Sequence, residues 1–205
     1  MSRDYRNLFE PFKIGKLEIK NKFVMAPMGP GGLSREDGSF NEKGVEYYVE
    51  RAKGGTGLII TGLNYVENEV EKKVMPTMPC PTLNPASFIK TAGQMTERVH
   101  AYDSKIFLQL TAGFGRVAIP TVLKEEAVAP SPIENFWNPK IKCRELTTEE
   151  VEYIVKKFAE ASVIAKMSGF DGVEIHAVHE GYLLDQFTIA LFNQRTDKYG
   201  GDLMG

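Results

Sequence analysis

The sequence has few cysteines, almost no net charge and no long apolar run. Cys80 and Cys143 are its only cysteines. Their spacing matches no metal-binding or redox motif, so we expect two reduced structural thiols, as in cytoplasmic proteins, and no metal site. A formal net charge of -2 supplies no basic surface, which argues against nucleic acid as a partner.

The sequence also lacks membrane and secretion signals. No uninterrupted apolar stretch approaches the ~18–20 residues that a membrane span needs. The first five residues, Met1-Ser2-Arg3-Asp4-Tyr5, do not form the apolar core of a secretory signal. We therefore expect no membrane association and a cytoplasmic location.

The composition is that of a globular protein. Hydrophobic residues make up 42% of the chain and charged residues 25%, which is typical of soluble domains rather than disordered chains. At 205 residues the chain is long enough to bury a substantial core as one domain.

Strand and helix signals alternate along the chain. After an expected hairpin at 12–19, short apolar segments predict strands at 23–26, 57–62, 105–110 and 172–177, the first stopped by Pro27. A strand–helix–strand alternation favours a parallel sheet with right-handed crossovers. Alternation alone does not separate an open sheet from a closed barrel.

Three helices are expected between these strands, each with a start signal. The first runs from about Asn41 to Lys53, and the second begins with Asn84 as cap and Pro85 in the first turn. In the third, Thr147 and Glu150 form a capping box. We expect its inward face to carry the apolar residues Val151, Ile154, Val155, Phe158, Ile164 and Ala165.

Residues 112–146 form a long connection that contains four prolines. A connection of that length in a compact domain is more often functional than idle, and we expect it to contribute to substrate choice.

Small or polar residues end each predicted strand, where ligands gather in parallel α/β proteins. The first three strands end in Ala26-Pro27-Met28, in Thr61-Gly62 and in Gln109. The amide of Gln109 needs partners for its donor and its acceptor, and a flat heterocycle would satisfy both. Small residues would let such a ring approach the backbone. On their own, Met28 could be a core residue and Thr61-Gly62 a turn.

The fourth predicted strand ends in His176, His179 and Tyr182. Two imidazoles can donate hydrogen bonds to a carbonyl oxygen while a phenol transfers a proton, so this group suggests chemistry on a carbonyl-bearing substrate. The alternative is a structural loop in which the histidines cap backbone groups and the tyrosine packs. Glycine-rich phosphate-binding fingerprints are absent from the sequence.

The chain resembles the NADH:flavin oxidoreductases of the old yellow enzyme family, in the branch of 2-enoate and 2,4-dienoyl-CoA reductases. The resemblance rests on segments in family order from residue 8 to residue 201, namely 8–12 (LFEPF), 21–28 (NKFVMAPM), 109–110 (QL), 169–177 (GFDGVEIHA) and 193–201 (NQRTDKYGG). The last two are long enough to make it specific.

The resemblance implies a (β/α)8 TIM barrel with FMN at the carboxyl ends of the strands and NAD(P)H as reductant. Ala26, Pro27 and Met28 would line the isoalloxazine, Gly62 would lie beside it, and Gln109 would bind its pyrimidine edge. His176 and His179 would hold the carbonyl oxygen of an α,β-unsaturated substrate. Reduced flavin would give a hydride to the β carbon, and Tyr182, with an ordinary pKa near ~10, would protonate the α carbon.

The sequence departs from the family pattern in spacing, at one side chain and in length. Tyr182 lies six positions after His176, a spacing that resembles the enoate reductase branch. Gly29 stands where relatives often carry a Thr or Cys that contacts the flavin. A complete barrel takes at least ~250 residues, so these 205 residues are expected to be the amino-terminal half of one, with about its first four strands.

Two expectations follow from that length. An iron–sulfur (4Fe-4S) cluster and an FAD domain would belong to a carboxyl-terminal part. The isolated chain would expose strand edges and therefore self-associate, as a homo-oligomer, or fold poorly. Two other hypotheses stay open. The chain could be a non-catalytic fragment that acts in assembly, or an FMN barrel of different chemistry. The placement of His176, His179 and Tyr182 disfavours the second.

Overall fold

The computed structural model describes residues 4–74, 78–177, 179 and 181–201. The chain divides into two compact units that are described separately. Unit 1 comprises Met1–Asn64, Met75–Gln109 and Ser162–Glu174, and unit 2 comprises Tyr65–Val74, Leu110–Ala161 and Ile175–Gly205.

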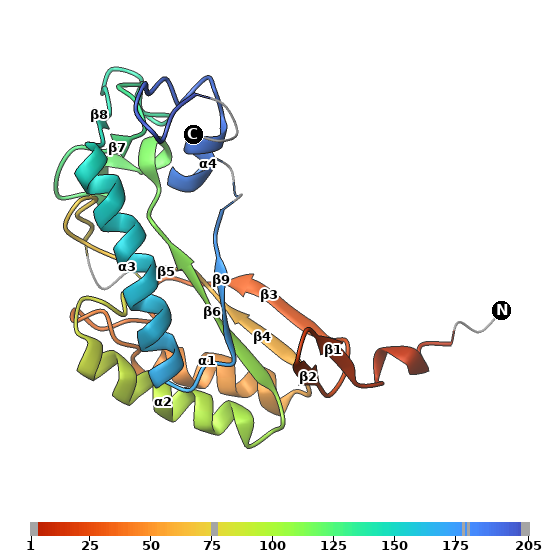
Figure 1. The fold of residues 1–205 in the computed structure, drawn as a ribbon. Helices are drawn as coiled ribbons and strands as arrows, with labels where there is room; N and C mark the ends of the chain where they lie inside the picture. The colour runs from red at the N-terminus through yellow and green to blue at the C-terminus, as the bar shows by residue number, and fades with distance from the viewer. Residues whose placement is uncertain (1–3, 75–77, 178, 180, 202–205) are drawn as a thin grey trace. The chain divides into compact units, whose positions relative to one another are not determined.

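The central sheet is built on the parallel strands β3, β4 and β6, which are neighbours in that order (Figure 1). Strand β3 (Val24–Met28) pairs with β4 (Leu58–Thr61), and β4 pairs with β6 (Lys105–Thr111), with Val24 opposite Leu58 and Leu58 opposite Lys105. Strands β5 (Asn64–Tyr65) and β9 (Gly172–Ile175) also pair with β6. The order β3, β4, β6, β9 has no reversal of the kind that marks a doubly wound sheet, which favours the barrel alternative.

The first predicted strand is longer than expected. It continues through Pro27 to Met28, with a register irregularity between Met25 and Met28. Proline is tolerated there because, in the described part of the chain, β3 pairs only with β4 and is an edge strand.

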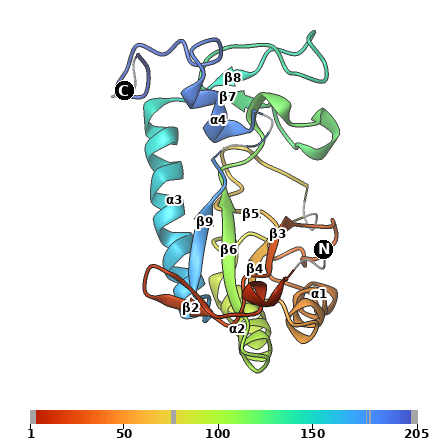
Figure 2. The same cartoon turned by 90° about the vertical axis from the view of Figure 1, so that its right-hand side faces the viewer.

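Two helices of unit 1 begin at the predicted caps. The side chain of Asn41 accepts a hydrogen bond from the Gly44 amide at the start of α1 (Glu42–Lys53), and Asn84 accepts one from the Ser87 amide at the start of α2 (Pro85–His100). The two helices lie side by side (Figure 1 and Figure 2). Their apolar faces are buried, with Tyr48 and Phe88 essentially inaccessible to water.

The hairpin and a short helix precede this arrangement. The hairpin consists of β1 (Phe12–Ile14) and β2 (Leu17–Ile19), paired antiparallel as predicted. The preceding 3-10 helix η1 (Arg6–Leu8) was not predicted.

Helix α3 (Thr148–Met167) begins with the predicted capping box. The Thr147 hydroxyl accepts from the Glu150 amide at 3.1 Å, and the Glu150 carboxylate accepts from the Thr147 amide at 2.8 Å. The predicted inward face is wrong at Val155, which is 56% exposed. This side chain lines an open apolar cavity of unit 2. It therefore lies on an apolar face of the helix, as predicted, but is not buried.

The long connection 112–146 is structured. It contains the 3-10 helices η2 (Gly115–Val117) and η3 (Pro120–Val122), and the paired strands β7 (Val128–Ala129) and β8 (Arg144–Glu145). It has a small core of Ala118, Ala127, Ala129 and Cys143. Both cysteines are buried thiols, as predicted, and burial raises the pKa of Cys143 to about 11.

A short helix, α4 (Leu183–Thr188), follows the fourth predicted strand. Across the described residues, we find no helix with the length and apolar character of a membrane span.

Candidate functional site

The end of β3 presents the residues predicted to line a cofactor ring. Ala26 and Met28 lie on one exposed face of the strand, and Met28 is 54% exposed. Pro27 is half-buried between them. A large apolar side chain left open at a strand end can pack against a flat aromatic group, so these residues fit the expected ring.

Gly62 lies where the ends of β3 and β4 approach most closely. A Cβ atom at Gly62 would clash with the backbone of Gly29, so this approach requires glycine at position 62. The Gly62 amide donates to the Tyr48 hydroxyl at 2.9 Å, and that hydroxyl lies 3.4 Å from the Met28 carbonyl. Burial raises the pKa of Tyr48. Tyr48, which the sequence did not single out, thus fixes both strand ends.

Gln109 is buried at the end of the unit 1 part of β6. Its side-chain Nε2 donates to the Glu174 carboxylate at 2.8 Å, and its backbone amide donates to the Thr61 hydroxyl at 3.1 Å. A carboxamide has two N–H donors and an acceptor oxygen. The bond to Glu174 uses one N–H, so the second N–H and the oxygen can bind the polar edge of a heterocycle.

A buried acceptor lies beside this glutamine. Asn64 Nδ2 donates to the Gly62 and Gln109 carbonyls, at 2.8 Å and 3.2 Å. Asn64 Oδ1 is buried and has no hydrogen-bond partner among the described residues. Buried acceptors are rarely left unpaired, so this atom is consistent with a ligand that donates a hydrogen bond at these strand ends.

In unit 2 the structure brings the three predicted catalytic residues together. The ring centroids of His176, His179 and Tyr182 are 5.0–5.2 Å apart. His176 directly follows β9. Its amide donates to the Leu110 carbonyl of β6 at 2.9 Å, which fixes the backbone at this position. Val178 and Glu180 of the same segment lie outside the described residues.

Asp185 of α4 holds the loop that carries His179. Its Oδ2 accepts from the His179 amide at 2.7 Å and from the Gly181 amide at 3.0 Å. Tyr182 is the residue that precedes α4, and its amide donates to the His179 carbonyl at 3.2 Å. The sequence did not single out Asp185, although an acidic residue in the first turn of a helix is a usual helix-start signal.

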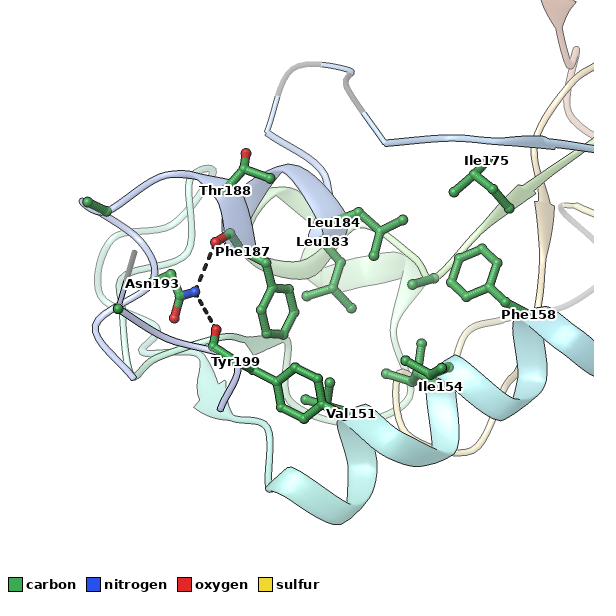
Figure 3. A pocket seen from close by; sticks show the side chains of 14 residues that line it. Val151, Ile154, Phe158, Ile175, Leu183, Leu184, Phe187, Thr188, Asn193 and Tyr199 are labelled. Carbon is green, nitrogen blue, oxygen red and sulfur yellow. Dashed lines mark hydrogen bonds between the residues drawn. The ribbon is translucent and has the colours of Figure 1, made fainter. Parts of the chain in front are cut away.

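The 193–201 segment, a main carrier of the family resemblance, has a structural role. Asn193 Nδ2 donates to the carbonyls of Phe187 at 2.9 Å and of Tyr199 at 2.7 Å (Figure 3). Buried Arg195 donates to the Leu146 carbonyl, to the Pro130 carbonyl at 3.0 Å and to Asp197. The Arg195 guanidinium keeps the pKa of Asp197 well below its usual range.

An apolar cavity of about 670 Å³ lies beside this segment in unit 2 (Figure 3). The side chains around it include Val151, Ile154 and Phe158 of α3 and Leu183, Leu184 and Phe187 of α4. Within the described ranges, no three or more His, Cys, Asp or Glu side chains are grouped so that they could hold a metal ion.

Comparison with known proteins identifies relatives over nearly the whole chain. The model of the NADH:flavin oxidoreductase / NADH oxidase family matches residues 7–204. Cinnamate reductase of Clostridium sporogenes is 65% identical over 203 residues, which are 99% of this chain and 30% of that protein. NADH oxidase of Thermoanaerobacter brockii is 40% identical over 199 residues, which are 96% of this chain and 29% of that protein.

A solved structure of the same enzyme type also matches this chain. The old yellow enzyme homologue of Zymomonas mobilis superimposes with a TM-score of 0.80 at 31% identity, over 96% of this chain and 55% of that chain. The α/β fold is therefore that of an old yellow enzyme TIM barrel, as predicted, and the chain spans about half of that structure and less than a third of the two curated relatives.

Proposed function

Because the chain belongs to the NADH:flavin oxidoreductase / NADH oxidase family, we propose that it is the amino-terminal half of an FMN-binding barrel. The complete enzyme reduces the C=C bond of α,β-unsaturated carbonyl compounds with NAD(P)H. The observation that carries this proposal is the cluster of His176, His179 and Tyr182, whose rings lie about 5 Å apart in unit 2.

The cofactor residues are those at the strand ends of unit 1. Ala26, Pro27, Met28 and Gly62 would line the isoalloxazine of FMN, and the Gln109 carboxamide would bind its pyrimidine edge. When bound, FMN supplies the hydride that NAD(P)H provides. The exposed side chain of Met28 and the buried acceptor Asn64 Oδ1 support this assignment.

The substrate residues act on the developing charge. The imidazoles of His176 and His179 donate hydrogen bonds to the substrate carbonyl oxygen, which gains negative charge as the β carbon receives hydride. Donors directed at a developing oxyanion favour the transition state more than the ground state. The phenol of Tyr182 gives its proton to the α carbon as general acid.

The substrates are enoates or enoyl thioesters. Sequence identity of 65% to a cinnamate reductase supports an aryl-substituted acrylate as the first compound to assay. The remaining length of that relative, of which this chain covers 30%, has room for the other half of a barrel and for further domains. A 4Fe-4S cluster and FAD would belong there.

The test is Tyr182→Phe in the full-length enzyme, with the two half-reactions measured separately by stopped flow. Reduction of the flavin by NADH should be unchanged, and its reoxidation by cinnamate should slow by roughly 10²–10⁴-fold, the usual contribution of a general acid. Tyr153→Phe on α3 is the matched control and should affect neither. Equal loss of both half-reactions would remove Tyr182 from the proton-donor role.

A further inference from the structure

The loop that follows β6 makes a tight turn at Gly113, Phe114 and Gly115. Both glycines have positive φ, 122° and 57°. A Cβ at Gly113 would clash with the Glu71 carboxylate, and one at Gly115 would clash with the Gln186 carboxamide. The turn is therefore clamped between two side chains, one from the 65–74 segment and one from α4.

The Glu71 side of this clamp is a buried ionic group. Its carboxylate accepts from the Phe114 amide at 3.1 Å and from the Gly115 amide at 2.6 Å. Lys73 Nζ lies 3.4 Å from Glu71 Oε2 and 3.8 Å from Glu67 Oε1. All three side chains are at most 1% exposed. Burial raises the pKa of Glu71, and Lys73 opposes the rise.

The Gln186 side connects the turn to the residues that flank Tyr182. Gln186 Nε2 donates to the Phe114 carbonyl at 3.1 Å and to the Gly181 carbonyl at 2.7 Å. The Leu183 amide donates to the Gly113 carbonyl at 3.2 Å. The backbone on both sides of Tyr182 is thus bonded to this turn directly or through one side chain.

The side chain of the turn completes the arrangement. The Phe114 ring meets the Tyr182 ring edge-on at 4.9 Å and the Tyr65 ring edge-on at 5.8 Å, and Lys73 Nζ lies 4.1 Å above the Tyr65 ring. Edge-to-face aromatic contacts have a preferred geometry. They therefore restrict the torsions of the tyrosine in a way that an aliphatic neighbour would not.

We infer that Phe114 is a positioning residue for Tyr182, and that the buried carboxylate of Glu71 fixes the turn that presents it. This inference rests on the proposed function, in which Tyr182 protonates the substrate. Proton transfer to carbon requires the phenol at one place relative to the α carbon, and a misplacement of about 1 Å can cost roughly 10²-fold in rate. Neither Phe114 nor Glu71 touches the reacting atoms in this role.

The first test is Phe114→Leu in the full-length enzyme, which keeps an apolar side chain and removes the ring. Reoxidation of reduced flavin by cinnamate should slow by about 10- to 100-fold in its limiting rate, whereas flavin reduction by NADH and flavin content should be unchanged. Phe114→Tyr, which keeps the ring, should restore the rate to within about threefold of wild type. Equal loss in both half-reactions would overturn the inference.

The decisive test is the double variant. If Phe114 acts through Tyr182, Phe114→Leu should have less than about a twofold effect in a Tyr182→Phe background, since residues that act as a unit are non-additive. Independent, multiplicative losses would overturn the positioning role and leave the proposed function intact. A normal rate in Tyr182→Phe alone would instead overturn the proton-donor assignment, and the positioning role with it.

Glu71→Gln tests the clamp from the other side. The substituted amide retains one acceptor oxygen but loses the charge next to Lys73, so the same substrate half-reaction should slow by about 10-fold, again only when Tyr182 is present. Glu69→Gln is the matched control because Glu69 is exposed in the same segment, and it should leave both half-reactions unchanged. Loss in the control, or equal loss in the Tyr182→Phe background, would overturn the role of Glu71.

Discussion

At the scale of single residues, the orientation of Gln109 depends on Glu174. Glu174 accepts the Nε2 hydrogen bond of Gln109 at 2.8 Å and so determines which way the carboxamide turns. We predict that Glu174→Leu weakens FMN binding to the full-length apoenzyme by about 2- to 10-fold, the value of one lost hydrogen bond. Glu174→Gln should retain most of the affinity because its carbonyl oxygen can accept the same bond.

Flavin fluorescence titration measures this effect, with Glu36→Leu, at an exposed position of unit 1, as the control. An unchanged dissociation constant in Glu174→Leu would mean that another group orients Gln109. The proposed fit of the carboxamide to the pyrimidine edge would then need a different support.

Sequence patterns located the strand-end residues but not the residues that hold them. Met28, Gln109 and His176 could be identified because each ends an apolar run, which is a local signal. Glu71 and Glu174 could not, because their partners, Gly115 and Gln109, lie 44 and 65 positions away. In Glu174 the only available signal was one charge inside an apolar strand, and Phe114 had only its place between two glycines.

At the scale of elements, the helix starts and the hairpin limits were predictable, whereas the end of β3 and the pairing of β7 with β8 were not. Asn41, Asn84 and the Thr147–Glu150 pair act within three positions of sequence, so the capping rules apply without knowledge of the fold. The extension of β3 through Pro27 depends on its edge position, and the pairing of β7 with β8 joins residues 16 apart. Both are tertiary effects that a local pattern does not contain.

The 193–201 segment gives a prediction at this scale. Its Asp197 accepts from the Arg195 guanidinium at 2.5 Å and from the Thr148 hydroxyl at 2.5 Å. Because Arg195 lowers the folded-state pKa of Asp197 below the unfolded value near ~3.9, the stabilisation is complete above that pH. It is lost as pH falls toward the folded-state pKa.

Asp197→Asn should therefore lower the free energy of unfolding at pH 7 by about 1.5–3 kcal/mol, the range for a hydrogen bond to a charged group. The difference between variant and wild type should shrink as pH falls below about 4, the unfolded-state pKa of an aspartate. Urea unfolding of the full-length enzyme at a series of pH values measures it, with Glu149→Gln, on the exposed first turn of α3, as control. A difference that does not change with pH would mean that the ionisation of Asp197 does not stabilise this segment.

At the scale of the whole molecule, apolar side chains remain open on the strands that have a single neighbour. In the described part of the chain, β3 pairs only with β4, and β9 pairs only with β6. Val24 on β3 is 49% exposed and Val173 on β9 is 37% exposed. Open strand edges with apolar faces favour association with another copy or another segment. The cavity of unit 2 adds a further apolar surface of this kind.

We therefore predict that the isolated 205-residue chain self-associates, and that a chain extended to the length of its relatives does not use these surfaces for association. Sedimentation velocity at several concentrations should show dimers or larger species for the short chain. A concentration-independent monomer would contradict the prediction. An extended chain that associates to the same degree would place the contact elsewhere on the molecule.

FMN titration of the 205-residue chain tests whether its strands hold only the flavin ring or the phosphate as well. In barrels of this type the phosphate site is usually built after the seventh and eighth strands, whereas the proposed ring contacts belong to strands that are present here. We expect FMN affinity to be at least ~10²-fold weaker in the short chain than in the extended one, because phosphate contacts are charge-assisted. Riboflavin, which lacks the phosphate, should bind the two chains more nearly alike. Equal affinities for FMN would mean that the first four strands hold the phosphate as well, in which case the amino-terminal half would be a flavin-binding module in its own right.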